Sequence, residues 1–237
     1  MLPTVILPGY LASAQDYLDL QQQLLDLGTD TVIVPLQRRD WFATLGGRPI
    51  TPILQQLHRT IQQLLQRTQA PQVNIVGHSA GGWISRIYMG SEPYFGQVWQ
   101  AQPQVNTLIS LGTPHTSQET WTLRNLNFVN GYYPDAFHAD VNYICVAGKA
   151  LYGQRSWQLG QWFTYNSYKV TCGEGECWGD GVTPITSAHL AGAVNLTLDH
   201  VWHSPRPTQA TRQKHQNRCY QWYGSPEVLK LWSNYLA

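Results

Sequence analysis

Residues 72–82 read QVNIVGHSAGG, and the rest of the chain is interpreted around this stretch. Residues 72–76 are largely apolar and predict a short buried strand, while residues 82–89 carry apolar side chains at helical spacing without proline. Between them, Gly77 and Gly81 flank Ser79 two residues away on either side. A serine on so tight a turn projects its Oγ from a strained backbone, and the two flanking positions come too close together for side chains. The pattern therefore predicts a nucleophilic serine, and a chance glycine-rich turn is the alternative.

Length and composition limit the class of protein. The chain has 237 residues, neither an internal repeat nor a break in composition, and we expect one domain over residues 1–237. Its net charge of +1 and the lack of a basic run argue against a nucleic-acid partner. Ten Trp and thirteen Tyr would suit an apolar substrate or a membrane interface, although core packing explains aromatic residues more often.

The sequence gives several expectations about location and cofactors. No apolar run reaches the roughly 18 residues of a membrane span. Residues 1–7 lack a basic start and lead into a strand, so they do not resemble a signal peptide. We therefore expect a cytoplasmic protein, with peripheral membrane contact left open. Cys172 and Cys177 do not match common zinc spacings, which favours incidental thiols or a local disulfide if oxidised. We expect no metal and no organic cofactor.

Strand and helix patterns alternate along the chain. Strands are predicted at residues 4–7, 31–34, 72–76, 105–111, 141–146 and 194–198. Helices are predicted from the Ser13 cap to Gly28, over residues 51–65 and 82–89, and over residues 226–236 with a Ser225 cap. This alternation predicts an α/β fold with a mostly parallel central sheet and helices on both faces. Residues 116–140 are expected to be irregular and to form a short cap or lid, and residues 147–182 a long loop.

A serine hydroxyl needs a base, and the base needs an orienting carboxylate. With a serine elbow these groups follow in later loops, the acid first. Asp180 is the best acid, because it lies between two glycines in the turn GDGVTP of residues 179–184. Asp135 and Asp140 precede the strand at 141–146 and come too early, and Asp199 lies near the end of the last strand. An ordinary turn aspartate is the alternative for Asp180.

The base is a choice between two histidines beyond the last strand. His200 continues the alternation of that strand, whereas His203 falls in the following loop, where its side chain is able to reach back over the sheet edge. We therefore favour His203. His78 and His115 are interpreted as active-site walls or structural hydrogen-bonding residues.

An oxyanion formed at the serine needs two preorganised N–H donors. One is expected to be the backbone N–H of Ala80, directly after the nucleophile. The other should come from the loop after the first strand, where Gly9 lets the backbone approach the substrate. Tyr10 N–H is the first choice and Leu11 N–H the reserve, with a simple turn as the alternative.

Five segments combine these features: PGY at 8–10, GHSAGG at 77–82, LGTPH at 111–115, GDGVTP at 179–184 and VWHSP at 201–205. In this order the chain resembles the lipase branch of the α/β-hydrolase superfamily, including esterase domains related to GPI inositol-deacylases and lipases of cyanobacterial and chloroplast type. The resemblance implies the α/β-hydrolase fold and ester hydrolysis, and it supports His203 over His200. One departure is Pro8, where the usual lipase has histidine before glycine, and we expect altered packing of that loop rather than lost activity.

Together these predictions describe a carboxylic ester hydrolase of the lipase or esterase type that works through an acyl-enzyme on Ser79. The substrate is expected to be an acyl lipid, such as a glycerolipid or galactolipid. Tentative substrate-binding residues are Leu11, His78, His115 and Trp121. Aromatic residues of 116–140 would cover an acyl chain, although an aromatic surface loop packed on the core is equally compatible. An acyltransferase with the same triad and, with less support, a non-catalytic binding protein on a hydrolase scaffold stay open.

Overall fold

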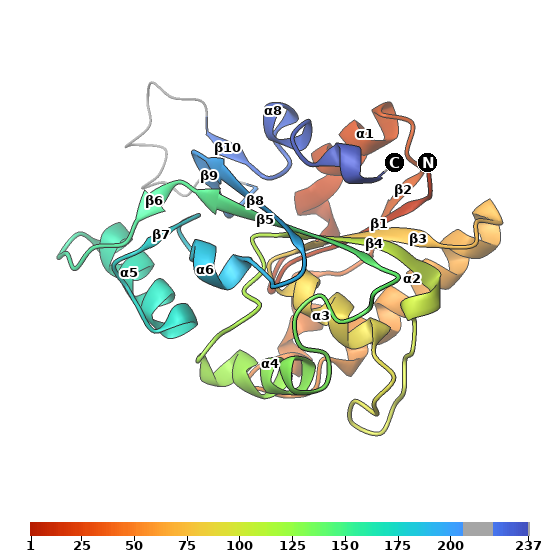
Figure 1. Cartoon of the computed structure of the whole chain (residues 1–237), viewed down its shortest axis with the longest axis horizontal. Helices are drawn as coiled ribbons and strands as arrows, with labels where there is room; N and C mark the ends of the chain where they lie inside the picture. Colours follow the sequence, from red (N-terminus) through yellow and green to blue (C-terminus); the bar gives the residue numbers. More distant parts are fainter. Residues whose placement is uncertain (206–219, 237) are drawn as a thin grey trace.

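Six parallel strands form the central sheet of the computed structural model, which describes residues 1–205 and 220–236 (Figure 1). The strands are β1 (Thr4–Leu7), β2 (Thr31–Ile33), β3 (Val73–His78), β4 (Val105–Leu111), β5 (Asn142–Lys149) and β8 (Val194–Asp199). Their order across the sheet is β2-β1-β3-β4-β5-β8, and every neighbouring pair is parallel. The predicted parallel sheet is therefore confirmed.

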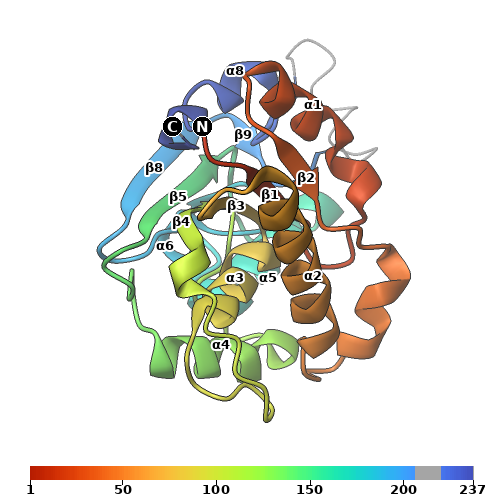
Figure 2. The same cartoon turned by 90° about the vertical axis from the view of Figure 1, so that its right-hand side faces the viewer.

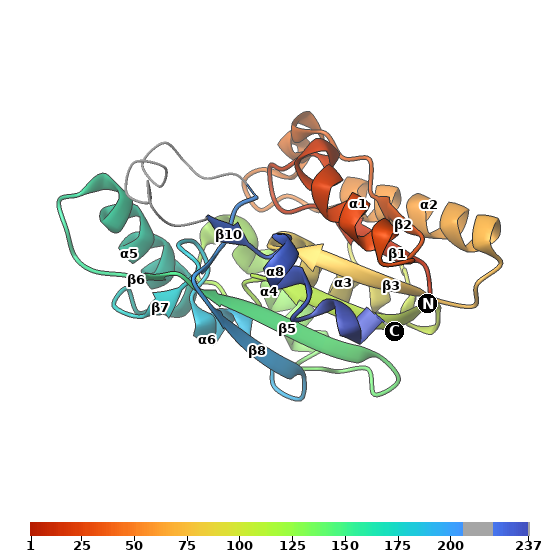
Figure 3. The ribbon, with the colours of Figure 1, turned by 90° about the horizontal axis from the view of Figure 1, so that it is seen from above.

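Helices cover both faces of this sheet (Figures 1 and 2). One face carries α1 (Leu18–Asp26), α8 (Pro226–Leu229) and the 3-10 helices η1 (Ala14–Tyr17) and η4 (Ser233–Leu236), and Figure 3 shows α1 and α8 lying over the strands. The other face carries α2 (Thr51–Thr68) and α3 (Ala80–Met89). In β1, Ile6 packs into the apolar cluster of α1 and α8, whereas Val5 and Leu7 pack into that of α2 and α3. This double burial explains why β1 is buried along its whole length.

Several short elements join the longer ones. They are η2 (Arg38–Thr44), η3 (Gln102–Gln104), α6 (Ile185–Ala188), the antiparallel pair β6 (Leu151–Tyr152) and β7 (Trp178–Gly179), and the parallel pair β9 (Val201–Trp202) and β10 (Gln221–Trp222). No helix within residues 1–205 and 220–236 is long and apolar enough to cross a membrane.

Three segments differ from the sequence-based expectation. Residues 116–140 are not irregular, because α4 (Thr120–Tyr132) forms there and buries Leu126 and Val129. Residues 147–182 are not one long loop, because α5 (Leu159–Cys172) lies between β6 and β7. The terminal helix predicted at 226–236 is broken after α8, where Trp232 turns inward and donates from Nε1 to the Tyr223 carbonyl oxygen at 2.9 Å.

The order of the strands fixes where a site can form. β1 has β2 on one side and β3 on the other. The connection from β1 to β2 therefore runs in one direction across the sheet, and the connection from β2 to β3 runs back in the other. Parallel α/β sheets bind ligands in the crevice at the carboxyl ends of the strands where this reversal occurs. The loop after β1 and the turn after β3 meet at this point.

Candidate active site

Ser79 lies at the turn between β3 and α3 with φ 52° and ψ −123°. A non-glycine residue pays a steric penalty in this region, so it persists only where the surroundings hold it. The Ser79 N–H donates to the Leu111 carbonyl oxygen of β4 at 2.8 Å, which fixes the turn from the neighbouring strand. The structure therefore has the strained serine turn that the sequence predicts.

Gly77 and Gly81 lie where neighbouring stretches of main chain approach too closely to leave room for a side chain. A Cβ built on Gly77 would lie 2.6 Å from the Gly81 carbonyl carbon. A Cβ built on Gly81 would lie 2.5 Å from the carbonyl oxygen of Leu7, at the end of β1. The predicted crowding between the two flanking positions holds for Gly77, whereas Gly81 is crowded by β1 instead.

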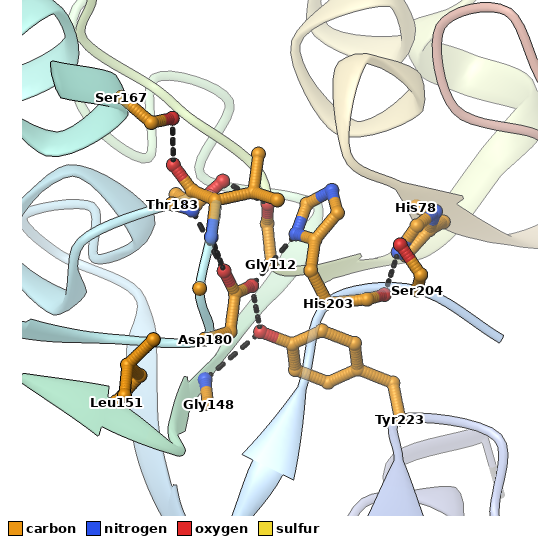
Figure 4. A network of polar contacts seen from close by, with 12 residues as sticks. His78, Gly112, Gly148, Leu151, Ser167, Asp180, Thr183, His203, Ser204 and Tyr223 are labelled. Atoms are coloured by element: carbon orange, nitrogen blue, oxygen red, sulfur yellow. Dashed lines mark hydrogen bonds and ion pairs between the residues drawn. The ribbon is translucent and has the colours of Figure 1, made fainter. Parts of the chain in front are cut away.

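Asp180 and His203 face each other across the carboxyl edge of the sheet (Figure 4). His203 Nδ1 lies 2.7 Å from Asp180 Oδ2. The other carboxylate oxygen accepts the N–H groups of Val182 at 3.0 Å and Thr183 at 2.7 Å. Burial alone would raise the Asp180 pKa, but His203 and the hydrogen bonds from Tyr223 and the Thr183 N–H outweigh it and hold the pKa below its usual value. The aspartate is therefore ionised and directs the His203 ring.

Tyr223 is a further partner of Asp180 that the sequence did not indicate. Its hydroxyl donates to Asp180 Oδ2 at 2.6 Å and accepts the Gly148 N–H at 2.9 Å (Figure 4). Burial and the nearby Asp180 charge raise the Tyr223 pKa well above its usual value, so the hydroxyl keeps its proton. Tyr223 comes from the segment beyond residue 219, and no local motif marks it.

The other acid and base candidates lie elsewhere. Strand β8 ends at Asp199, and His200 follows in an exposed turn with φ 61°. Asp199 forms a surface ion pair with Lys149 at 3.4 Å. Asp135 and Asp140 are also at the surface. Of the candidates weighed, the structure pairs only Asp180 with His203.

A pocket of about 290 Å³ opens beside Ser79 and His203. Its wall is formed by Gly9, Tyr10, Leu11, Ala12, Asp16, Tyr17, Arg38, His78, Ser79, His203, Ser204 and Pro205. Among residues 1–205 and 220–236, the N–H groups of Tyr10 and Leu11 have no hydrogen-bond acceptor. Ala80 begins α3, where amides have no partner inside the helix. Tyr10 and Leu11 thus line the same pocket as Ser79, and Ala80 follows Ser79 at the start of α3.

The tentative substrate-binding residues have different positions. Leu11 lines the pocket and is 43% exposed. His78 also lines it, but its Nδ1 faces the Tyr17 hydroxyl and its Nε2 faces the His203 carbonyl oxygen, so neither nitrogen is free for a substrate. His115 and Trp121 are not part of the pocket wall.

His115 lies instead in a buried polar cluster with Arg86 and Cys145. Its Nδ1 is 3.4 Å from Arg86 Nη1, and its Nε2 is 3.5 Å from the Cys145 sulfur. Burial and the Arg86 charge lower the His115 pKa well below its usual value. Arg86 of α3 also donates to the Tyr133 carbonyl oxygen at 2.6 Å, which attaches α4 to the helix behind Ser79.

An ion pair at the pocket wall was also missed from the sequence. Arg38 Nη2 lies 3.2 Å from Asp16 Oδ1, and Asp16 Oδ2 accepts both the N–H and the hydroxyl of Ser13. The Asp16 side chain is 8% exposed and the Arg38 side chain 67%. This ion pair therefore forms part of the pocket wall.

The cysteine pair lies away from this pocket. The sulfurs of Cys172 and Cys177 are 3.9 Å apart, at the end of α5 and just before β7. In the part of the chain that the structure describes, both are free thiols, as is Cys145. Cys219 lies outside the described residues.

Comparison with known proteins addresses the fold. Residues 47–133 match the family described as PGAP1-like alpha/beta domain. No curated protein matches the sequence significantly. The structure is similar to phospholipase PlaB from Legionella pneumophila, with 13% identity and a TM-score of 0.60, and the match covers 100% of this chain and 64% of that one. It is also similar to the lin2722 gene product of Listeria innocua, with 13% identity and a TM-score of 0.53 over 100% of this chain and 93% of that one.

This chain thus spans slightly less than two thirds of the Legionella phospholipase. Likeness at 13% identity concerns the fold, and the matched stretch 47–133 contains β3, the Ser79 turn and α3. The sequence match and the sheet topology agree with the resemblance drawn from the motifs. The chain therefore has the α/β-hydrolase fold, with a PGAP1-like alpha/beta segment at its centre.

Proposed function

We propose that this chain is a serine hydrolase that cleaves carboxylic esters. One observation carries the proposal: the strained Ser79 lines the same pocket as His203, whose ring is held from behind by the buried Asp180. In this assignment Ser79 is the nucleophile, His203 the general base and Asp180 the carboxylate that orients the base. Because His203 Nδ1 donates to Asp180, its Nε2 carries the lone pair needed to accept a proton.

The reaction proceeds in two steps. Ser79 Oγ attacks the ester carbonyl carbon while His203 Nε2 accepts the hydroxyl proton, and the resulting imidazolium is stabilised by Asp180. The tetrahedral oxyanion is held by the backbone N–H groups of Tyr10 and Ala80. The alcohol then leaves with the proton from His203. Water repeats the sequence on the acyl-enzyme and releases the carboxylic acid.

An acyl lipid is the proposed substrate class. Aromatic side chains are exposed on α4 and α5, including Trp121 at 50%, Trp162 at 57% and Phe163 at 56%. Such surfaces suit an apolar chain or the interface of a membrane, which the protein would meet peripherally. The Legionella pneumophila protein of similar fold is a phospholipase, which supports this choice.

Labelling with a fluorophosphonate probe tests the chemistry. The wild-type chain should take up one probe at Ser79, the Ser79→Ala variant none, and the exposed-serine control Ser91→Ala as much as wild type. Turnover of p-nitrophenyl butyrate should fall by about 10⁶-fold in Ser79→Ala. Esterase activity that survives in Ser79→Ala would disprove the assignment, and absence of wild-type labelling would leave a non-catalytic scaffold as the answer.

Ester preference tests the substrate class. Long-chain p-nitrophenyl esters and diacylglycerolipids should be cleaved with higher kcat/KM than p-nitrophenyl acetate. The lipid proposal is wrong if acetate is cleaved well and long-chain esters and glycerolipids are not cleaved at all. Transfer of the acyl group to an added alcohol in preference to water would identify an acyltransferase with the same residues.

A further inference from the structure

A line of buried hydrogen-bonding groups joins the loop after β1 to His203. The Gly9 N–H donates to the Tyr17 hydroxyl at 3.0 Å, the hydroxyl lies 2.7 Å from His78 Nδ1, and His78 Nε2 lies 2.9 Å from the His203 carbonyl oxygen. Tyr17 is fully buried and His78 is 4% exposed. Figure 4 shows His78 against the main chain that follows the His203 ring. Solvent therefore does not compete for these bonds.

The direction of each bond follows from the acceptor at its end. A carbonyl oxygen only accepts, so His78 Nε2 must carry the proton that faces His203. Burial, and after it the His203 charge, lowers the His78 pKa to about 3, so the ring is neutral and its Nδ1 accepts the Tyr17 proton. Burial raises the Tyr17 pKa, so that hydroxyl keeps its proton and accepts from Gly9. All three bonds point the same way and polarise one another.

This line connects three parts of the proposed catalytic machinery. Gly9 directly precedes Tyr10, whose N–H is a proposed oxyanion donor. His78 directly precedes Ser79 in the chain. His203 is held on its other side by Asp180, through the ring bond and through the His203 N–H to the Asp180 carbonyl oxygen at 3.0 Å. The line thus sets the oxyanion donor, the nucleophile and the base relative to one another.

The rings of His78 and His203 lie close, with centroids 4.8 Å apart. A proton taken up by His203 during acyl transfer places a positive charge beside His78. A second cationic ring at this distance would oppose that step. Burial keeps the His78 ring neutral, and the Tyr17 hydroxyl occupies the one lone pair that the ring has free.

We propose that Tyr17 and His78 are positioning residues for ester hydrolysis, which align the oxyanion loop and His203 with Ser79 through one continuous hydrogen-bonded line. This proposal rests on the proposed function. Neither residue exchanges a proton with the substrate, and their effect is exerted through Gly9 and His203. They should therefore act on the chemical step rather than on substrate binding.

Tyr17→Phe tests the proposal, because it removes one oxygen and keeps the ring in the core. We expect kcat for p-nitrophenyl butyrate and the rate of Ser79 labelling by a fluorophosphonate to fall about 10- to 100-fold, with KM near its wild-type value. His78→Gln keeps an N–H that is able to reach the His203 carbonyl oxygen, and should retain about tenfold more activity than His78→Leu. Labelling should still reach one probe per chain.

A second histidine–tyrosine pair supplies the matched control. His58 Nδ1 lies 2.9 Å from the Tyr88 hydroxyl, and neither residue is in the pocket wall. Tyr88 is as buried as Tyr17, so Tyr88→Phe reports the cost of losing a buried hydroxyl alone. It should leave kcat and the labelling rate unchanged.

Four outcomes overturn the proposal. The first is an unchanged kcat and labelling rate in Tyr17→Phe, and the second is a loss of kcat in Tyr88→Phe as large as that in Tyr17→Phe. The third is equal activity of His78→Gln and His78→Leu. The fourth is a labelled fraction of Tyr17→Phe that falls in proportion to its activity, which would mean that the variant is partly unfolded. Failure of the proposed function looks different, because wild-type Ser79 itself would then not be labelled.

Discussion

Replacing Gly81 with alanine tests whether the spacing of β1 and α3 controls the site. An added Cβ would lie 2.5 Å from the Leu7 carbonyl oxygen, whereas ordinary contact begins at 3.4 Å. The two backbones must therefore separate by about 0.9 Å, the difference between these distances, because the packed core offers no free space. Leu7 leads directly into the loop of Gly9 and Tyr10, so the shift moves the proposed oxyanion donors away from Ser79.

Two magnitudes follow for Gly81→Ala. Overpacking costs about 1–3 kcal/mol, partly offset by the roughly 0.5–1 kcal/mol that alanine gains over glycine within a helix. We expect a net loss of about 1–2 kcal/mol in the free energy of unfolding, measured by urea titration. A displacement of this size should lower kcat for p-nitrophenyl butyrate about 10²-fold.

Gly131→Ala is the matched control. Gly131 lies in α4, and a Cβ there would meet no atom within 4 Å. This variant should be as active as wild type and equally stable or slightly more stable, by up to about 1 kcal/mol. If Gly81→Ala unfolds at the wild-type urea concentration and keeps the wild-type kcat, the steric argument for the serine turn is refuted.

Three further substitutions probe the pocket. Asp180→Asn keeps the shape but not the charge, and should lower kcat about 10⁴-fold at pH 7; a loss of less than tenfold would contradict its orienting role. Tyr223→Phe removes a donor that lowers the Asp180 pKa, and should lower the free energy of unfolding by about 1–3 kcal/mol. A carboxyl whose pKa is lowered by folding stabilises the protein above its unfolded pKa of about 3.9, and this stabilisation is lost as pH falls through the folded-state pKa. The variant should therefore unfold at a higher pH in an acid titration followed by Trp fluorescence. An unchanged midpoint would argue against the Tyr223 contribution. Arg38 lines the pocket, so its positive charge should favour an ester that carries a free carboxylate. Arg38→Gln should therefore lower kcat/KM for monomethyl adipate relative to uncharged methyl hexanoate about two- to fivefold. Arg39→Gln, on the same helix but outside the pocket wall, should leave this ratio unchanged, and equal ratios in both variants would exclude a contact between Arg38 and the substrate carboxylate.

Motifs with a local steric cause were predictable. Gly77 is required by a backbone contact within one strand–turn–helix unit, and Gly81 by the close approach of β1. Because both glycines flank the serine turn, their spacing in the sequence was sufficient to locate it. Asp180 and His203 were selected by their order and by the loops that carry them, and the structure brings their side chains within 2.7 Å. Their catalytic roles stay predictions until the variants are measured.

Helices stabilised by distant partners were not predictable. Residues of α4 have weak intrinsic helix preference, and this helix is held by burial of Leu126 and Val129 and by Arg86 at its carboxyl end. The segment of α5 is rich in aromatic residues and interrupted by glycines, which concealed its helix. The terminal helix is broken after α8, where Trp232 is fully buried in the apolar cluster of α1 and α8.

The sequence by itself determined the parallel α/β sheet, the position of Ser79 and the choice of Asp180 and His203, because these depend on periodicity, local sterics and chain order. Only the tertiary structure decided what surrounds them. Tyr17 and Tyr223 are ordinary residues in the sequence, and the hydrogen-bond partners of His78 could not be read from it. These residues become partners of the site because chain segments far apart meet at the carboxyl ends of β1, β3 and β5. A hydrogen bond depends on distances of a few tenths of an ångström, and no spacing along the chain encodes these between separate elements.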